Sequence, residues 1–181
     1  MWLISLFIVL FPILKTEAVI DFSDPQQMRD WIIVNDGVMG GLSSGNVQLT
    51  DEGALFTGRV SLENNGGFAS FRSPYSRIDL SSFDTIEIKY RSNGLPCAMS
   101  FYRYSQFWRP NHKLPLALSK DWSIIKIPLL DLAEYRMGSK TGNTISKDQL
   151  SELIRIGFIT DSKNEGDFVF EVDYVKFTSI N

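Results

Sequence analysis

The sequence predicts an all-β protein, a two-sheet antiparallel sandwich of the jelly-roll type, and three observations favour this fold. Short segments of alternating apolar and polar residues recur along the chain, separated by Gly, Asn, Ser and Pro. Helical patterns are few and do not alternate with the strand patterns, which disfavours a parallel α/β sheet. With 181 residues, of which 44% are hydrophobic, the chain suits one domain with a single core.

The first 18 residues, MWLISLFIVLFPILKTEA, predict a secretory signal peptide, and residues 19–181 then form the folded domain. An apolar run over residues 2–14 precedes the small residue Ala18, and this run is too short to cross a bilayer comfortably. We therefore expect a secreted or extracytoplasmic protein with no membrane span in the mature chain.

Nine segments are expected to form strands, and two of them alternate most clearly. In 84–91 (DTIEIKYR) every second residue is apolar, so one face of that strand is expected to be wet. The segment 166–177 is expected to be a long strand near the centre of a sheet. Its expected core-facing residues are Phe168, Phe170, Val172 and Tyr174. The other strands are expected at 47–50, 54–62, 67–72, 98–104, 114–118, 122–127 and 154–160.

Two short helices are expected, and each has a recognisable start signal. Pro25 follows Asp24, which places a proline at the first helical position after a capping acid. The second helix is expected over 147–153, directly after Ser146.

The composition gives little support to catalysis. His112 is the only histidine and lies in RPNHKLP, which is expected to be a loop, with no G-x-S-x-G motif beside it. Cys97 is the only cysteine, so the chain offers neither an intrachain disulfide nor the three or four ligands of a zinc site. We expect no enzyme activity, cofactor or metal, although an unidentified carboxylate pair could still hydrolyse a glycosidic bond. The net charge of −3 gives no general attraction for nucleic acid.

Two segments rich in Asn and Gly are candidates for a binding site, NDGVMGGLSSG at 35–45 and SLENNGGFASFRS at 61–73. Their glycines permit positive φ and their Asn and Asp side chains can accept hydrogen bonds from loop N–H groups, so tight turns alone could explain them. If both segments lie at one end of the sandwich, they would present donors, acceptors and a planar guanidinium to a sugar, a carboxylate or a partner's backbone. The candidate residues are Asn35, Asp36, Asn64, Asn65 and Arg72. For Arg72 an internal ion pair with Asp36 or Glu63 is the alternative.

A third segment, FYRYSQFWRPNHK at 101–113, interleaves five aromatic residues with basic ones. Alternate aromatic residues are expected to enter the core while the others cover a connection between strands. Trp108 and Arg109 are the residue types favoured as interface anchors, so they are candidate contacts for a protein or a glycan.

Several motifs together resemble the complex I intermediate-associated protein 30 family, whose members are NADH:ubiquinone oxidoreductase assembly factors. These are Trp31, NDGVMGG at 35–41 with Ser43, FTG at 56–58, and ENNGGFAS at 63–70 before Arg72. Trp122, IGFITDS at 156–162 and GDFVFEVDYVKF at 166–177 match its closing elements. The resemblance covers residues 19–177. It implies a galactose-binding-like domain without established catalytic residues and, for eukaryotic relatives, a chaperone-like role in complex I assembly.

These observations favour a non-catalytic binding or assembly module that acts through protein contacts, with a respiratory-complex assembly intermediate as one such partner. The alternative is an extracytoplasmic carbohydrate-binding module whose partner is a glycan. The leader favours secretion, whereas the resemblance to eukaryotic assembly factors makes a mitochondrion-associated location the alternative. The absence of Arg from the leader argues against a mitochondrial transit peptide.

Overall fold

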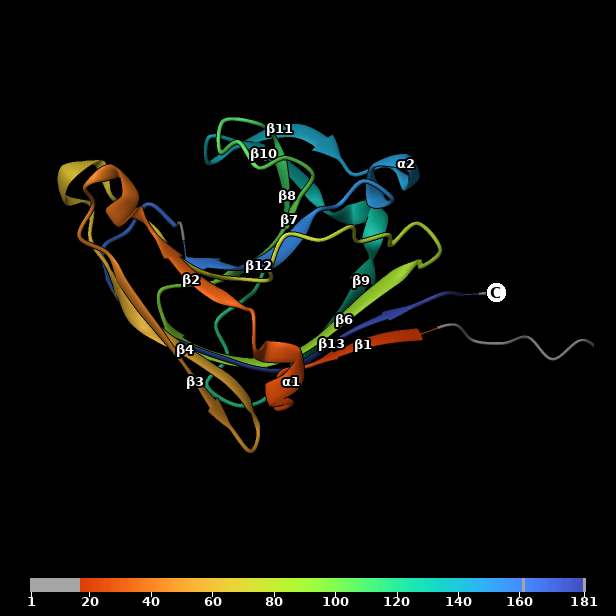
Figure 1. Cartoon of the computed structure of the whole chain (residues 1–181), viewed down its shortest axis with the longest axis horizontal. Helices are drawn as coiled ribbons and strands as arrows, with labels where there is room; N and C mark the ends of the chain where they lie inside the picture. The colour runs from red at the N-terminus through yellow and green to blue at the C-terminus, as the bar shows by residue number, and fades with distance from the viewer. Residues whose placement is uncertain (1–16, 161, 181) are drawn as a thin grey trace, which may run out of the picture.

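A computed structural model describes residues 17–160 and 162–180 and confirms the predicted two-sheet antiparallel sandwich (Figure 1). The described residues form thirteen strands, two short α-helices and three 3-10 helices. Residues 1–16 of the predicted signal peptide lie outside the described residues. Glu17 and Ala18, its last two residues, belong to the first strand.

The first sheet has six strands, and its centre is the strand expected at 166–177. This strand, β13, pairs with β6 along one edge, and along the other edge it pairs first with β4 and then with β1. The order is β3-β4-β13-β6-β9. The bounds are β1 (Glu17–Asp21), β3 (Ser44–Thr50), β4 (Gly53–Val60), β6 (Thr85–Gly94), β9 (Ser123–Pro128) and β13 (Gly166–Thr178).

The second sheet has seven strands, in the order β11-β10-β8-β7-β12-β5-β2, and all of its pairs are antiparallel. This is the sheet that carries the candidate site. The bounds are β2 (Ile32–Asn35), β5 (Ala69–Arg72), β7 (Ala98–Tyr102), β8 (Asn111–Pro115), β10 (Ala133–Arg136), β11 (Ser139–Thr144) and β12 (Arg155–Thr160).

Both predicted helices are present, and each is shorter than a typical helix. The Asp24 side chain caps α1 (Pro25–Met28) by accepting from the Gln26 N–H, and Ser146 and Gln149 form a capping box at α2 (Lys147–Leu150). The 3-10 helices are η1 (Asp36–Met39), η2 (Glu63–Asn65) and η3 (Leu129–Asp131). No helix in the described part of the chain is long and apolar enough to span a membrane.

Each of the nine predicted strands has a counterpart, but four strands were not predicted and one was displaced. Strands β1, β2, β10 and β11 were missed. The last of these, SKTGNT, is exposed along its whole length and therefore has no apolar alternation to reveal it. Strand β8 occupies Asn111–Pro115 rather than 114–118, so His112 lies in a strand and not in the expected loop.

The expected facing of β13 holds only for its first half. Phe168, Phe170 and Val172 are buried, but the register with β6 shifts between Val172 and Tyr174. This bulge turns Tyr174 to the other face, where its hydroxyl donates to Glu87, and it brings Val175 into the core. The extra residue explains why one fixed alternation could not describe the whole strand.

The core lies between the two sheets and is rich in phenylalanine. Phe158 of the second sheet packs against Phe170 of the first, with their ring centroids 4.9 Å apart. Each sheet therefore buries one face against the other. The opposite face of each sheet is left for other contacts.

Candidate functional site

The outward face of the seven-stranded sheet carries the candidate site. Side chains alternate across a strand, so Phe71 of β5 and Phe158 of β12 face the core, while their neighbours point outward. The register pairs Arg72 with Gly157 and Arg155 with Tyr102. Side chains from distant parts of the sequence therefore meet on this face.

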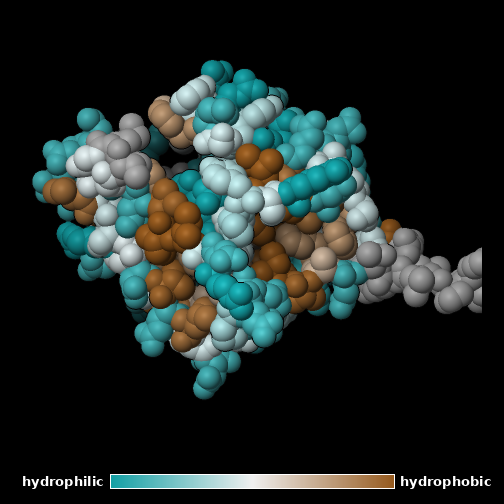
Figure 2. Space-filling view, in the orientation of Figure 1, coloured by the Kyte–Doolittle hydropathy of each residue, from teal (hydrophilic) through white to brown (hydrophobic). Residues whose placement is uncertain are grey.

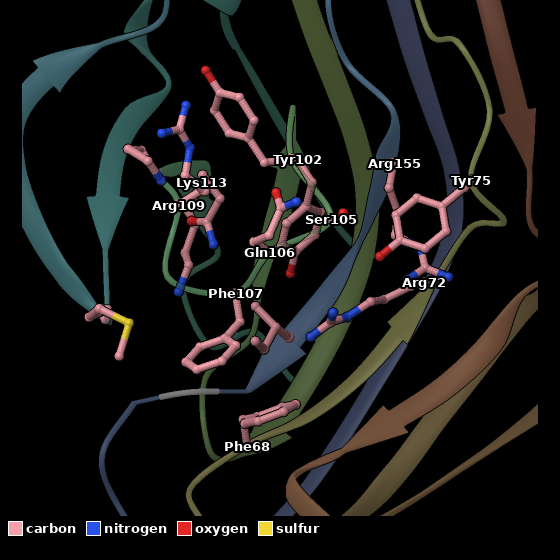
Figure 3. A pocket seen from close by; sticks show the side chains of 16 residues that line it. Phe68, Arg72, Tyr75, Tyr102, Ser105, Gln106, Phe107, Arg109, Lys113 and Arg155 are labelled. Carbon is pink, nitrogen blue, oxygen red and sulfur yellow. The ribbon is translucent and has the colours of Figure 1, made fainter. Parts of the chain in front are cut away.

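A cavity of about 220 Å³ opens on this face (Figure 3). In that view Arg72, Tyr75 and Arg155 occupy one side and Arg109 the other, with Gln106 between them. The volume is below the roughly 300–1,000 Å³ of pockets for drug-sized ligands, so it suits one small group or one unit of a longer chain.

A second cavity, of about 380 Å³, continues the first along the same face. The two share Lys113 and Gly138 in their linings, and the second extends over Ala98 and Pro115. Together they form a groove across several strands. Figure 2 shows a hollow in this part of the surface, between the region of η1 and η2 and the region of β10 and β11.

Arg155 is the most enclosed arginine of the cavity, with 6% of its surface exposed. Its Nε donates to the Ser73 carbonyl oxygen at 2.7 Å, and its guanidinium carbon lies 3.9 Å from the centroid of the Tyr75 ring. These contacts fix the plane of the guanidinium, and no ion pair joins it to a described Asp or Glu.

Arg72 and Arg109 reach the same cavity from different elements. The Nε of Arg72 donates to Ser70 Oγ at 2.8 Å, and its guanidinium lies 5.1 Å from the Tyr102 ring centroid. Arg109 belongs to the loop after β7, and its guanidinium lies 4.1 Å from the Tyr104 ring centroid. Neither expected ion pair of Arg72, with Asp36 or with Glu63, is formed.

Aromatic side chains form the rim of the cavity. Phe107 and Trp108 are 62% and 51% exposed, and their rings meet edge to face at 5.3 Å. Phe107 lines the cavity, whereas Trp108, on the same loop, contacts Phe107 without lining the cavity itself. Of the five aromatic residues of this segment only Phe101 enters the core, so the expected alternation does not continue past it; Tyr102 and Tyr104 are half-buried on the outward side.

The two Asn- and Gly-rich segments are neighbours, which meets the condition on which the sequence hypothesis depended, and Asp36 joins them. Its carboxylate accepts hydrogen bonds from the Ser43 hydroxyl and N–H and from the backbone N–H groups of Gly67 and Phe68. Burial acts to raise the pKa of Asp36, but these hydrogen bonds outweigh it, and the pKa is lowered from its usual value. The carboxylate thus holds the loops together from the inside, 2% exposed.

The three asparagines of these segments lie at the same end of the molecule, outside the cavity lining. Asn64 and Asn65 are exposed in η2 with φ of 55° and 60°, left-handed values that asparagine tolerates. Asn35 ends β2, and its Oδ1 is buried without a hydrogen-bond partner among the described residues.

Of the seven residues proposed from the sequence, the structure brings Arg72 and Arg109 into one cavity. The sequence had assigned them to separate segments. It missed Tyr75, Tyr102 and Arg155, although Arg155 is a single charged residue inside the apolar run LIRIGFI. A charge at a position expected to be buried is the signal that could have identified it.

His112 faces the core and is completely buried. Burial lowers its pKa to about 4, the carboxylate of Glu134 opposes this, and Arg103 reinforces it. Within residues 17–160 and 162–180, no three His, Cys, Asp or Glu side chains group as metal ligands would.

Comparison with known proteins agrees with this architecture. The profile of the family described as Complex I intermediate-associated protein 30 matches residues 20–172. Among curated protein sequences, none matches the chain significantly.

Several of the similar solved structures are carbohydrate-binding modules. The family 11 module of a cellulosomal cellulase of Clostridium thermocellum has a TM-score of 0.64 at 15% identity, over 91% of this chain and 95% of the module. The same module in complex with a β-1,3-1,4-mixed-linked tetrasaccharide has a TM-score of 0.60 at 14% identity, over 90% and 95%. A family 29 module variant complexed with cellulohexaose has a TM-score of 0.51 at 10% identity, over 91% and 92%. At these identities the likeness shows the shared fold.

Proposed function

This chain belongs to the Complex I intermediate-associated protein 30 family, and from that premise and the geometry of the cavity we propose that it is a non-catalytic module that binds a glycan. The observation that carries the proposal is the convergence of arginines and aromatic rings on one open cavity of the seven-stranded sheet. The sequence alone favoured a protein-binding role and held glycan binding as the alternative. Because of the cavity, we now place glycan binding first and protein binding second.

The chemistry of the lining suits a sugar ring. An exposed aromatic ring such as that of Phe107 can stack on the apolar C–H surface of a sugar, while Gln106 and the guanidinium of Arg72 supply directed hydrogen bonds to its hydroxyl groups. Such a combination of apolar surface and a few placed polar groups is typical of small-molecule sites.

The groove suits a chain of sugars better than a single free one. The first cavity holds a small unit, and the second continues from it past Lys113 and Gly138, which lets neighbouring units lie along the sheet. The tetrasaccharide and cellulohexaose complexes of the similar modules support this proposal.

Binding of the full chain to a glycan array that includes β-glucan oligosaccharides, followed by calorimetry with each hit, tests the proposal. We expect Tyr102→Ala and Tyr104→Ala to weaken binding by about tenfold each, since each removes a ring from the cavity. Trp122→Ala is the matched control, because Trp122 stacks with Arg91 on the other sheet. An array with no hit would overturn the proposal.

Family membership favours a second candidate, an assembly-factor-like role through protein contacts. Recovery of respiratory-complex subunits with a tagged chain, lost in Trp108→Ala, would support it. Recovery of background proteins alone would count against it.

The predicted leader supports an extracytoplasmic location, where glycans are accessible. Localisation of a C-terminally tagged protein, with the sequence of its mature N-terminus, tests this. A mature protein that begins near residue 19 outside the cytoplasm is expected. Retention of residues 1–18 in a mitochondrial fraction would contradict it.

A further inference from the structure

We propose that the cavity selects an acidic glycan, binding a carboxylate or sulfate group of the sugar between Arg72, Arg109 and Arg155. The inference rests on the proposed glycan binding and adds the chemical class of the ligand. It follows from the charge of the lining, from the way the guanidinium groups are held, and from the contrast with arginines elsewhere.

The described residues that line the first cavity include these three arginines and no Asp or Glu. Other arginines of the domain, by contrast, form ion pairs with carboxylates. Arg59 pairs with Asp167 and Glu165, and Arg91 pairs with Glu171 and Glu52. Arg72, Arg109 and Arg155 therefore meet in a cavity whose described lining holds no carboxylate to neutralise their charge.

The two best-held guanidinium groups are oriented for an anion. Arg72 uses Nε to donate to Ser70, and Arg155 uses Nε to donate to the Ser73 carbonyl oxygen. The terminal nitrogen atoms of both make no hydrogen bond to the described protein, so they are left for a ligand. A planar guanidinium matches two oxygens of a carboxylate or sulfate, which a lone sugar hydroxyl does not offer.

Burial makes this arrangement costly without a ligand. Arg155 is almost enclosed, and a cation removed from water without a counter-ion is unfavourable. The stacking of Arg155 on Tyr75 and of Arg109 on Tyr104 offsets part of that cost. An anion would offset more of it, because charge-assisted hydrogen bonds strengthen where water is partly excluded.

The positive charge of the three arginines is confined to the cavity. The whole chain has a net charge of −3, so a polyanion gains little from the protein as a whole. Recognition would depend on fitting the anionic group into the cavity. This distinguishes the site from a surface that attracts any polyanion.

Calorimetry with the full chain tests the inference. The probes are oligosaccharides of galacturonate, glucuronate, mannuronate and guluronate, each beside its neutral methyl ester, and a sulfated galactan oligosaccharide beside its unsulfated parent. We expect at least one acidic member to bind about tenfold to a hundredfold tighter than its neutral counterpart. Whether the uronates or the sulfated galactan show the preference identifies the anionic group.

Arg72→Gln and Arg109→Gln are expected to remove most of that preference. Arg72→Lys, which keeps the charge without the planar fork, should retain part of it. The control is Arg59→Gln, on the other sheet, which should bind as the wild type does. Thermal unfolding of each variant separates a lost contact from a lost fold.

The outcomes distinguish the two proposals. Equal or tighter binding of the neutral members would overturn the acidic-ligand inference and leave glycan binding intact. Preference for the acidic members that survives both Gln substitutions would also overturn it. Binding to no acidic or neutral glycan would overturn both proposals.

Discussion

The Asp36 carboxylate accepts a hydrogen bond from the backbone N–H of Phe68 at 3.1 Å, across 32 residues of sequence. The ring of Phe68 lines the cavity and lies 5.7 Å from the guanidinium carbon of Arg72. Asp36 therefore positions one wall of the binding site although its own side chain is buried. Its contribution is to the shape of the site rather than to contact with a ligand.

We predict that Asp36→Asn lowers the free energy of unfolding by about 2–3 kcal/mol, because an amide cannot accept the same set of hydrogen bonds from Ser43, Gly67 and Phe68. Urea denaturation at pH 7 measures the change. Asp167→Asn, at an exposed site, is the control and should change stability little. Equal stability of the wild type and Asp36→Asn would contradict the role assigned to Asp36.

The difference in stability between the wild type and Asp36→Asn is also expected to depend on pH. The folded state lowers the pKa of Asp36, so its stabilisation is complete above the unfolded value of 3.8 and is lost as pH falls through the folded value. The stability difference between wild type and Asp36→Asn should therefore shrink below about pH 4. A difference that stays constant down to the acid transition would show that ionisation of Asp36 is not involved.

The buried His112 is expected to make the stability of the protein depend on pH in a second, separate way. Its pKa falls from 6.5 to about 4 on folding, so the unfolded chain binds a proton that the folded chain does not between these values. The wild type should lose about 3 kcal/mol relative to His112→Leu as pH drops from 7 to 4. Denaturation of both proteins across this range measures it. A constant difference would mean that the imidazole titrates normally.

A side chain added at Gly157, beneath the cavity, is expected to clash with the neighbouring strand. A Cβ at this position would lie 2.5 Å from the Phe71 carbonyl oxygen and 2.9 Å from the Arg72 Cα. Gly157→Ala should therefore destabilise the fold by about 2–3 kcal/mol and shift Arg72. Thermal unfolding and glycan calorimetry measure both effects. Gly37→Ala is the control, since its Cβ would meet no atom within 4 Å.

Substitution of Trp108 is expected to weaken ligand binding while leaving the stability of the fold almost unchanged. Its ring is half exposed and contacts Phe107 at the rim, so Trp108→Ala should change the free energy of unfolding by less than about 0.5 kcal/mol. Ligand binding should weaken severalfold because Phe107 loses its support. If Trp108→Ala left every detected interaction unchanged, the rim would have no part in recognition.

The sequence by itself determined the fold class and much of its layout. Period-two alternation is a local property, so it identified the two faces of β6 and the central position of β13. The motif pattern identified the family, and the paired Asn- and Gly-rich segments pointed to neighbouring loops that Asp36 joins.

Only the tertiary structure decided where the site lies. Arg72 and Arg155 are far apart in sequence and meet because β5 pairs with β12, and local alternation carries no information about which strands pair. The bulge in β13 and the exposed strand β11 were hidden for a related reason, since one breaks the alternation and the other lacks apolar residues. A binding site built from strand neighbours depends on the order of the strands, which the long-range packing of the whole chain sets.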